Sequence, residues 1–100
     1  MAELLFSNKA VEDLTNIWNH MVETWSEAQV DKYYTTLVDT CREIADTLRP
    51  LGREYTEIRS GLFEYRTGRH IVFYRSAADD TVEIVRILHE RMDLKHRIGE

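Results

Sequence analysis

Apolar residues recur every three or four positions along the first half of the chain, and this spacing predicts two helices with one buried face each. The first apolar stripe covers residues 11–25 and the second covers residues 30–48. Between them, Ser26 and Gln29 have the spacing of a capping box, which marks the start of a new helix. Because the connection is so short, we expect the two helices to form an antiparallel hairpin.

Beyond Pro50 and Gly52, which end the second helix, the spacing changes to every second residue, as in strands. Thr67-Gly68 is suited to a tight turn between two strands, and residues 77–80 are expected to form a loop. The segments 70–75 and 81–88 are apolar on both faces, which is typical of central strands. The predicted strands are, in chain order, residues 3–6, 63–66, 70–75 and 81–88.

These elements predict an α+β fold with the order β-α-α-β-β-β, in which the N-terminal helical hairpin packs on one face of a small, mainly antiparallel sheet. The length of 100 residues fits one domain, residues 1–100. Residues 90–100 are polar and are expected to form a short turn or a frayed helix. With only short loops over the second sheet face, we expect a groove that a partner fills.

The composition, with 43% hydrophobic and 31% charged residues, is that of a globular domain. The single cysteine, Cys41, excludes an internal disulfide, and its place on the second apolar stripe predicts a buried thiol. The sequence has no phosphate-binding loop, no dinucleotide motif and no metal-ligand spacing among its four histidines. Its apolar runs are too short to span a bilayer, and it begins without an export signal. We therefore expect a cytoplasmic domain with no membrane segment, metal or cofactor.

Charge is distributed unevenly along this chain of net charge −5. Residues 1–49 contain four Lys or Arg against nine Asp or Glu, whereas residues 50–100 contain nine of each kind. Eight of the ten arginines follow Pro50. Arginine suits fixed, bidentate recognition of carboxylate or phosphate, so any working face is expected in the second half. The alternative is that these arginines pair with the nine acids and form a solvated surface.

Arg86 is a permanent charge inside the last apolar strand. Because an unpaired buried guanidinium is costly, Arg86 is expected either to pair within the sheet or to face an open site. The candidate partners are Glu57, Glu64 and Glu83.

Three residues of the second half form a candidate catalytic set: Arg59 before a turn, Arg86, and His89 at the end of the last strand. If they converge at one sheet edge, two cations and one titratable group suit phosphodiester chemistry. Position alone favours a surface role for His89, and Asp93 is placed to cap the final turn.

The order of these elements and several short segments resemble the ParE toxins of bacterial toxin–antitoxin operons, within the RelE/ParE superfamily. The resemblance covers residues 3 to 97. The matching segments are Ala10-Val11-Glu12-Asp13-Leu14, Ile17-Trp18, Leu51-Gly52-Arg53, Glu57-Ile58-Arg59, Gly61, Gly68-Arg69-His70-Ile71-Val72-Phe73-Tyr74-Arg75, Ile84-Val85-Arg86-Ile87-Leu88-His89 and Arg91-Met92-Asp93.

The resemblance implies a toxin that inhibits DNA gyrase and blocks replication, and that a ParD-like antitoxin neutralises by covering its groove. It also leaves open a ribosome-dependent mRNA endoribonuclease of the RelE type. Lysines are present only at Lys9, Lys32 and Lys95, outside the predicted sheet. The net negative charge also disfavours direct binding to nucleic acid. These departures favour a non-enzymatic inhibitor.

The resemblance and the charge pattern together nominate two sets of contact residues. The candidates for binding the target are Arg59, Arg69, Arg86, His89, Arg91 and Asp93. The candidates for anchoring the antitoxin are the aromatic residues of the helices, which exceed what two helices need to seal a small sheet. They are Trp18, Trp25, Tyr33 and Tyr34.

Overall fold

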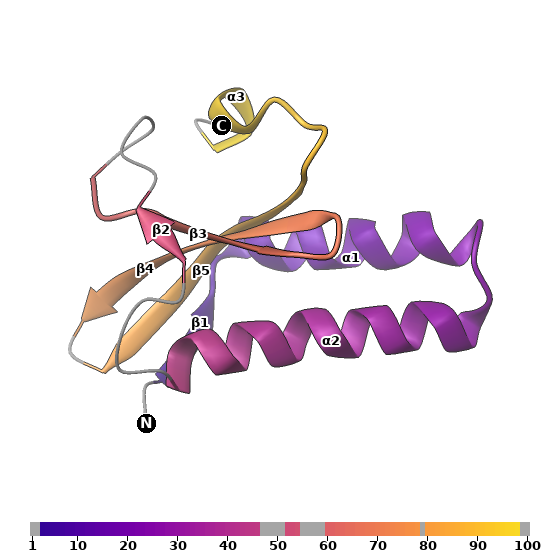
Figure 1. The fold of residues 1–100 in the computed structure, drawn as a ribbon, viewed down its shortest axis with the longest axis horizontal. Helices are drawn as coiled ribbons and strands as arrows, with labels where there is room; N and C mark the ends of the chain where they lie inside the picture. The colour runs from indigo at the N-terminus through magenta and orange to yellow at the C-terminus, as the bar shows by residue number, and fades with distance from the viewer. Residues whose placement is uncertain (1–2, 47–51, 55–59, 79, 99–100) are drawn as a thin grey trace.

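The computed structural model describes residues 3–46, 52–54, 60–78 and 80–98. A helical hairpin packs against a twisted sheet, and a short C-terminal helix lies on the other side of the sheet (Figure 1). The elements are β1 (Glu3–Phe6), α1 (Asn8–Val22), α2 (Glu27–Asp46), β2 (Arg53–Glu54), β3 (Phe63–Thr67), β4 (His70–Ala78), β5 (Thr81–His89) and α3 (Leu94–Ile98).

The sheet has five strands in the order β1-β5-β4-β3-β2. β1 runs parallel to β5, and the other neighbouring pairs are antiparallel. The predicted α+β fold is therefore confirmed, with the short β2 added at one edge, and α3 lies within residues 90–100, where a short turn or a frayed helix was expected.

Side-chain caps define where the two long helices begin. The Ser7 hydroxyl accepts a hydrogen bond from the Ala10 N–H at 3.0 Å and donates to the Val85 carbonyl at 2.6 Å, so it ties α1 to β5. Ser26 and Gln29 exchange two hydrogen bonds of 3.3 Å each, which confirms the predicted capping box. The predicted end of the second helix at Pro50 lies outside the described residues.

Two apolar clusters hold the two faces of the sheet. Leu37, Cys41 and Ile44 of the helical hairpin pack against Val72, Ile84 and their neighbours on one face. On the other face, Ile98 and Leu94 of α3 pack against a cluster that contains Leu62, Ile71, Phe73 and Leu88. The expectation that only loops cover this second face is wrong, because Leu94 and Ile98 lie one helical turn apart and give α3 an apolar side. Asp93 caps α3 through a 3.3 Å hydrogen bond from the His96 N–H, as predicted.

Both tight turns of the meander differ from the prediction by a few residues. Thr67 pairs with His70, so the first turn consists of Gly68 and Arg69 rather than Thr67 and Gly68. β4 continues to Ala78, which pairs with Thr81, so the predicted loop over 77–80 is wrong and the hairpin closes in a shorter turn. Asp80 in this turn has φ 57°, a conformation that aspartate tolerates better than most residues.

A bulge in β5 changes which way its side chains face. Phe73 pairs with Arg86 and Tyr74 pairs with Ile84, which leaves Val85 as an extra residue. As a result, Ile84 and Ile87 both face the helical hairpin, whereas Val85 packs with the α3 cluster.

Candidate functional site

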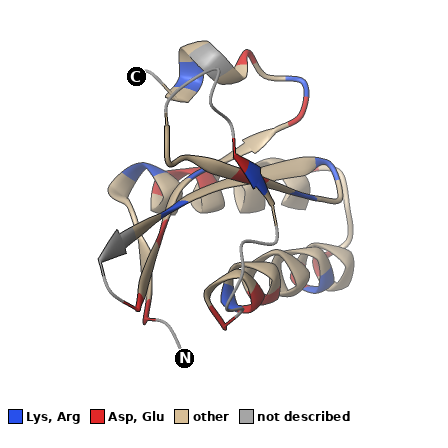
Figure 2. Ribbon diagram, turned by 60° about the vertical axis from the view of Figure 1, so that its left-hand side comes forward, with Lys and Arg blue, Asp and Glu red and all other residues tan. Residues whose placement is uncertain are grey.

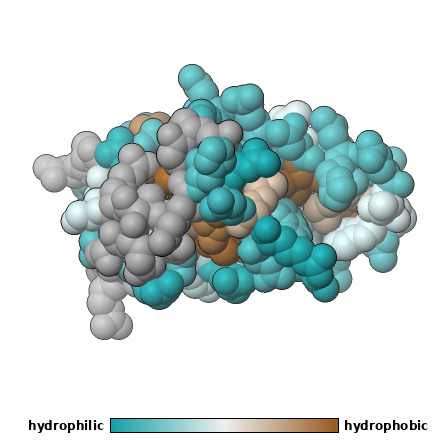
Figure 3. Space-filling model, turned by 90° about the horizontal axis from the view of Figure 1, so that it is seen from above, coloured by the Kyte–Doolittle hydropathy of each residue, from teal (hydrophilic) through white to brown (hydrophobic). Residues whose placement is uncertain are grey.

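A groove of about 810 Å³ lies between α1, the β3–β4 turn, the end of β5 and the segment that leads into α3. Seen from the α3 side, apolar surface (brown) lies between hydrophilic walls (teal) in Figure 3. The apolar contribution comes from Ile17, Met21, Ile87, Leu88 and Met92. The charged and titratable lining residues are Arg69, Arg86, Arg91, Arg97, His20, His70, His89 and Asp13.

The groove is cationic although the chain is acidic. Asp13 is the only carboxylate among the described residues that line it, against four arginines. Arg and Lys residues (blue) lie on the sheet, its turns and the segment next to α3, whereas several acidic residues (red) lie on α2 (Figure 2). Four arginines from the second half of the chain therefore line one groove, as expected for a working face in that half.

Arg86, which follows the bulge in β5, forms an ion pair with Asp13 of α1. Its Nε and Nη2 donate to the two carboxylate oxygens of Asp13 at 2.8 and 2.9 Å, and both side chains are 9% exposed. Nη1 donates to the Arg97 carbonyl at 2.6 Å, and the Ile87 N–H donates to Asp13 at 3.0 Å. The bidentate pair therefore joins α1, β5 and the C-terminal helix.

The predicted partners of Arg86 are wrong for the described residues. Glu64 pairs with Arg53 at 2.9 Å, Glu83 pairs with Arg75 at 2.8 Å, and Glu57 lies outside the described residues. The bulge interrupts the alternation of β5 just before Arg86, and the guanidinium reaches Asp13 of α1 and the Arg97 carbonyl rather than a glutamate of the sheet.

Four rings follow one another along one end of the groove. Ring centroids are 6.0 Å apart for Trp25 and Tyr33, 5.6 Å for Tyr33 and His70, and 5.3 Å for His70 and His89. Burial lowers the pKa of His70 from 6.5 to about 4, with a further lowering from His89 and an opposing effect of Glu90. His70 is therefore neutral at pH 7, and its Nδ1 lies 2.7 Å from the Tyr33 hydroxyl.

The structure brings most of the target-binding candidates together. Arg69, Arg86, His89 and Arg91 all line the groove. Arg59 lies outside the described residues, so its predicted convergence with Arg86 and His89 stays a prediction. Asp93 caps α3 and is not among the lining residues.

Comparison with known proteins identifies the family. A family model described as the ParE toxin of the type II toxin–antitoxin system parDE matches residues 4–94. The chain belongs to the ParE toxin family. It is 33% identical over 94 residues to Toxin ParE1 of Mycobacterium tuberculosis, covering 94% of this chain and 95% of the relative. Toxin ParE1 of Caulobacter vibrioides is also 33% identical, over 93% of this chain and 94% of that protein.

Solved structures show the same fold for this ParE-type toxin. A chain of the chromosomal ParDE toxin–antitoxin system of P. aeruginosa superimposes with a TM-score of 0.75 at 19% identity, covering 89% of this chain and 96% of that one. A chain of the RelBE2 toxin–antitoxin complex of Mycobacterium tuberculosis gives a TM-score of 0.65, covering 88% of this chain and 90% of that one, also at 19% identity.

The aromatic candidates of this ParE-type toxin divide between two surfaces. Trp25, which is 45% exposed, and Tyr33 line the groove described above. Trp18 and Tyr34 meet edge to face with centroids 5.3 Å apart. With Leu14, Thr15 and Asn19, they line a second hollow of about 290 Å³ between α1 and α2.

Asp13, His20, His70 and Arg97 line the groove although they were not among the predicted site residues. The apolar spacing of the first helix predicts Asp13 on the polar face, and this is wrong: the structure buries Asp13 beside Leu14, where it pairs with Arg86. In the described part of the chain, no cluster of three or more metal-binding side chains occurs, and no helix is long and apolar enough to cross a membrane.

The conformation of the β3–β4 turn, which lines the groove, depends on Gly68. Gly68 has φ +58°, and a Cβ at this position would lie 2.6 Å from the Tyr33 hydroxyl oxygen. We expect Gly68→Ala to lower the free energy of unfolding by about 1–2 kcal/mol from the backbone conformation alone, with the steric contact adding to it. Urea unfolding of this variant beside Gly61→Ala, at an open position with φ +83°, separates the two contributions. Equal losses would contradict a steric role for Tyr33.

Proposed function

We propose that this ParE-type toxin inhibits DNA gyrase by binding it and is neutralised by a ParD-like antitoxin. The observation that carries the binding mechanism is the pairing of Arg86 with Asp13, because a cleavage mechanism needs that guanidinium free beside His89. The gyrase target follows from the family, and the antitoxin from the family and from the ParDE system of the P. aeruginosa neighbour.

The groove offers the surface for the target. Arg69 and Arg91 line it, and neither guanidinium has an ion pair or hydrogen bond among the described residues. These two available cations, together with the apolar lining of the groove, suit a protein surface that carries carboxylates beside apolar side chains. Arg59, His89 and Asp93 complete the proposed target contacts, with Arg86 holding the groove's shape from within.

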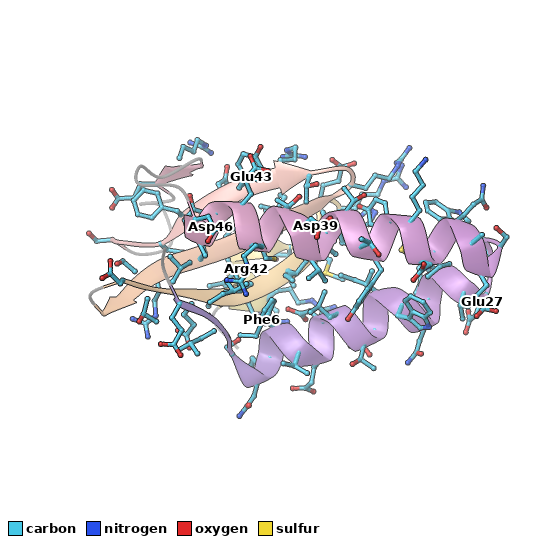
Figure 4. The ribbon with its side chains drawn as sticks, turned by 90° about the horizontal axis from the view of Figure 1, so that it is seen from below. Phe6, Glu27, Asp39, Arg42, Glu43 and Asp46 are labelled. Atoms are coloured by element: carbon cyan, nitrogen blue, oxygen red, sulfur yellow. The ribbon has the colours of Figure 1, made fainter. Side chains whose placement is uncertain are left out.

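The helical hairpin offers the surface for the antitoxin. Trp18 and Tyr34 line a hollow that a partner side chain can enter, and Trp25 and Tyr33 extend the aromatic surface toward the groove. Asp39, Glu43 and Asp46 follow one another along α2 when the hairpin is seen from below (Figure 4). A complementary antitoxin segment therefore carries basic residues beside its apolar anchors.

A supercoiling assay with purified toxin and gyrase tests the target. Wild-type toxin is expected to inhibit supercoiling, and the Arg69→Ala, Arg91→Ala double variant is expected to need at least about tenfold more toxin, since charged hydrogen bonds contribute roughly 1.5–3 kcal/mol each. Arg75→Ala is the control, because Arg75 pairs with Glu83 outside the groove. Full supercoiling at excess wild-type toxin would exclude gyrase as the target.

The alternative function is a ribosome-dependent mRNA endoribonuclease of the RelE type. One observation favours it: His89 lines the groove with Arg69 and Arg91, whose guanidinium groups make no ion pair or hydrogen bond within the described part of the chain, and its Nδ1 accepts a 3.1 Å hydrogen bond from the Arg91 N–H. Codon-positioned cuts in translated mRNA that disappear in His89→Ala would establish this activity, with gyrase unaffected.

A further inference from the structure

The β3–β4 turn is fastened to the rest of the protein through the backbone of Arg69. On one side, the Arg69 N–H donates to the Tyr33 hydroxyl oxygen at 3.1 Å. On the other side, the Arg69 carbonyl accepts a 3.0 Å hydrogen bond from the Glu90 N–H. The turn is thus held between α2 and the end of β5, with both polar groups of one residue engaged.

The Tyr33 hydroxyl has a defined direction in this arrangement. It accepts from the Arg69 N–H, so its own hydrogen is available for His70 Nδ1 at 2.7 Å. His70 is buried and neutral, and in the tautomer that carries its proton on Nε2 it accepts this hydrogen at Nδ1. Trp25 also contacts the tyrosine ring edge to face, with ring centroids 6.0 Å apart.

The side chain of Arg69 is free although its backbone is fixed. Among the described residues, its guanidinium makes no ion pair and no hydrogen bond, and the residue is exposed at the groove. A guanidinium carried by a fixed backbone loses less conformational freedom on binding than one on a loose turn. The arrangement is that of a cation presented to a partner.

We propose that Tyr33 is a positioning residue that holds the Gly68–Arg69 turn so that Arg69 binds a carboxylate on the target protein. This inference rests on the proposed function, because it takes the target to be gyrase. It assigns Tyr33 a different role from that of an antitoxin anchor. A carboxylate fits better than a nucleic-acid phosphate, because the groove has an apolar floor and the chain carries a net charge of −5.

The test measures binding of toxin variants to gyrase in the absence of DNA. Arg69→Ala is expected to weaken binding by about tenfold or more, and Tyr33→Phe by about threefold to tenfold, since one hydroxyl with two hydrogen bonds is lost. Tyr65→Phe is the matched control, because the Tyr65 hydroxyl makes no hydrogen bond among the described residues and the ring lies outside the groove.

The double variant separates positioning from general damage. If Tyr33 acts through Arg69, adding Tyr33→Phe to Arg69→Ala causes no further loss of binding. An equal loss in both backgrounds, or a Tyr33→Phe variant that binds like Tyr65→Phe, would overturn the inference. An effect of Arg69→Ala seen only when DNA is present would also overturn it, in favour of a phosphate contact.

Hydrogen exchange of the Arg69 amide keeps the two proposals distinguishable. Tyr33→Phe is expected to accelerate this exchange about fivefold or more relative to Tyr65→Phe, because the amide loses its acceptor. If wild-type toxin does not bind gyrase, the proposed function is wrong, and so is the proposed contact between Arg69 and a carboxylate of gyrase. The amide exchange still decides whether Tyr33 holds the turn: unchanged exchange in Tyr33→Phe overturns the positioning role.

Discussion

Replacing Arg86 with alanine is expected to lower the free energy of unfolding by about 3–5 kcal/mol, because one half of a buried ion pair is removed and a carboxylate is left behind. Asp13 would keep only the Ile87 N–H as a donor from this cluster, and the Arg97 carbonyl would lose the 2.6 Å bond that connects it to β5. Urea unfolding monitored by circular dichroism measures the change.

Arg75→Ala provides the control for this experiment. Arg75 pairs with Glu83 at 2.8 Å on the surface, where its side chain is 48% exposed, and such a pair contributes about 0–1 kcal/mol. A second comparison replaces Asp13 and Arg86 together by leucine and methionine, which should recover much of the loss because no charge stays buried alone. A loss in Arg86→Ala no larger than in Arg75→Ala would contradict the structural role of the pair.

Acidification is expected to destabilise the protein through His70. Its pKa is lowered from 6.5 to about 4 in the folded state. Between these pH values, His70 is therefore protonated in the unfolded chain but mostly neutral in the folded protein. Stability from this residue is therefore unaffected above pH 6.5 and falls as the pH drops toward 4, by at most about 3 kcal/mol.

His70→Asn isolates this contribution from that of the carboxylates. The asparagine oxygen can accept from the Tyr33 hydroxyl in place of Nδ1, and the amide does not titrate in this range. The free energy of unfolding, measured at pH 7, 5.5 and 4, should fall more steeply for the wild type than for the variant. Parallel curves would show that His70 is protonated equally in both states.

The elements whose pattern is local were predicted from the sequence, and those that depend on distant contacts were not. The two helices and the Ser26–Gln29 box are set by neighbours within a few positions, and the structure confirms them, although Val11, Val22 and Trp25 of the first stripe are exposed. The bulge at Val85 and the cover provided by α3 depend on how strands and helices meet in space. Periodicity along one segment carries no information on either.

The candidate site shows the same division. Arginine content pointed to the second half of the chain, and four of its predicted residues do line one groove. The partner of Arg86 lies 73 positions away on the first helix, so a search among nearby glutamates could not find it. Likewise, Tyr33 is one aromatic residue among several in the sequence, and only the position of the β3–β4 turn shows what its hydroxyl binds.

The short length of β1 affects how the sheet meets other chains. β1 pairs with β5 only as far as Ile84, and an unpaired strand edge is a template for strand addition and aggregation. Beyond that point, the Ser7 hydroxyl donates to the Val85 carbonyl and the Asp13 carboxylate accepts from the Ile87 N–H. These side chains occupy the hydrogen-bonding groups that a foreign strand would need. A polypeptide can therefore extend the sheet along this edge only by displacing Asp13, which would also release Arg86.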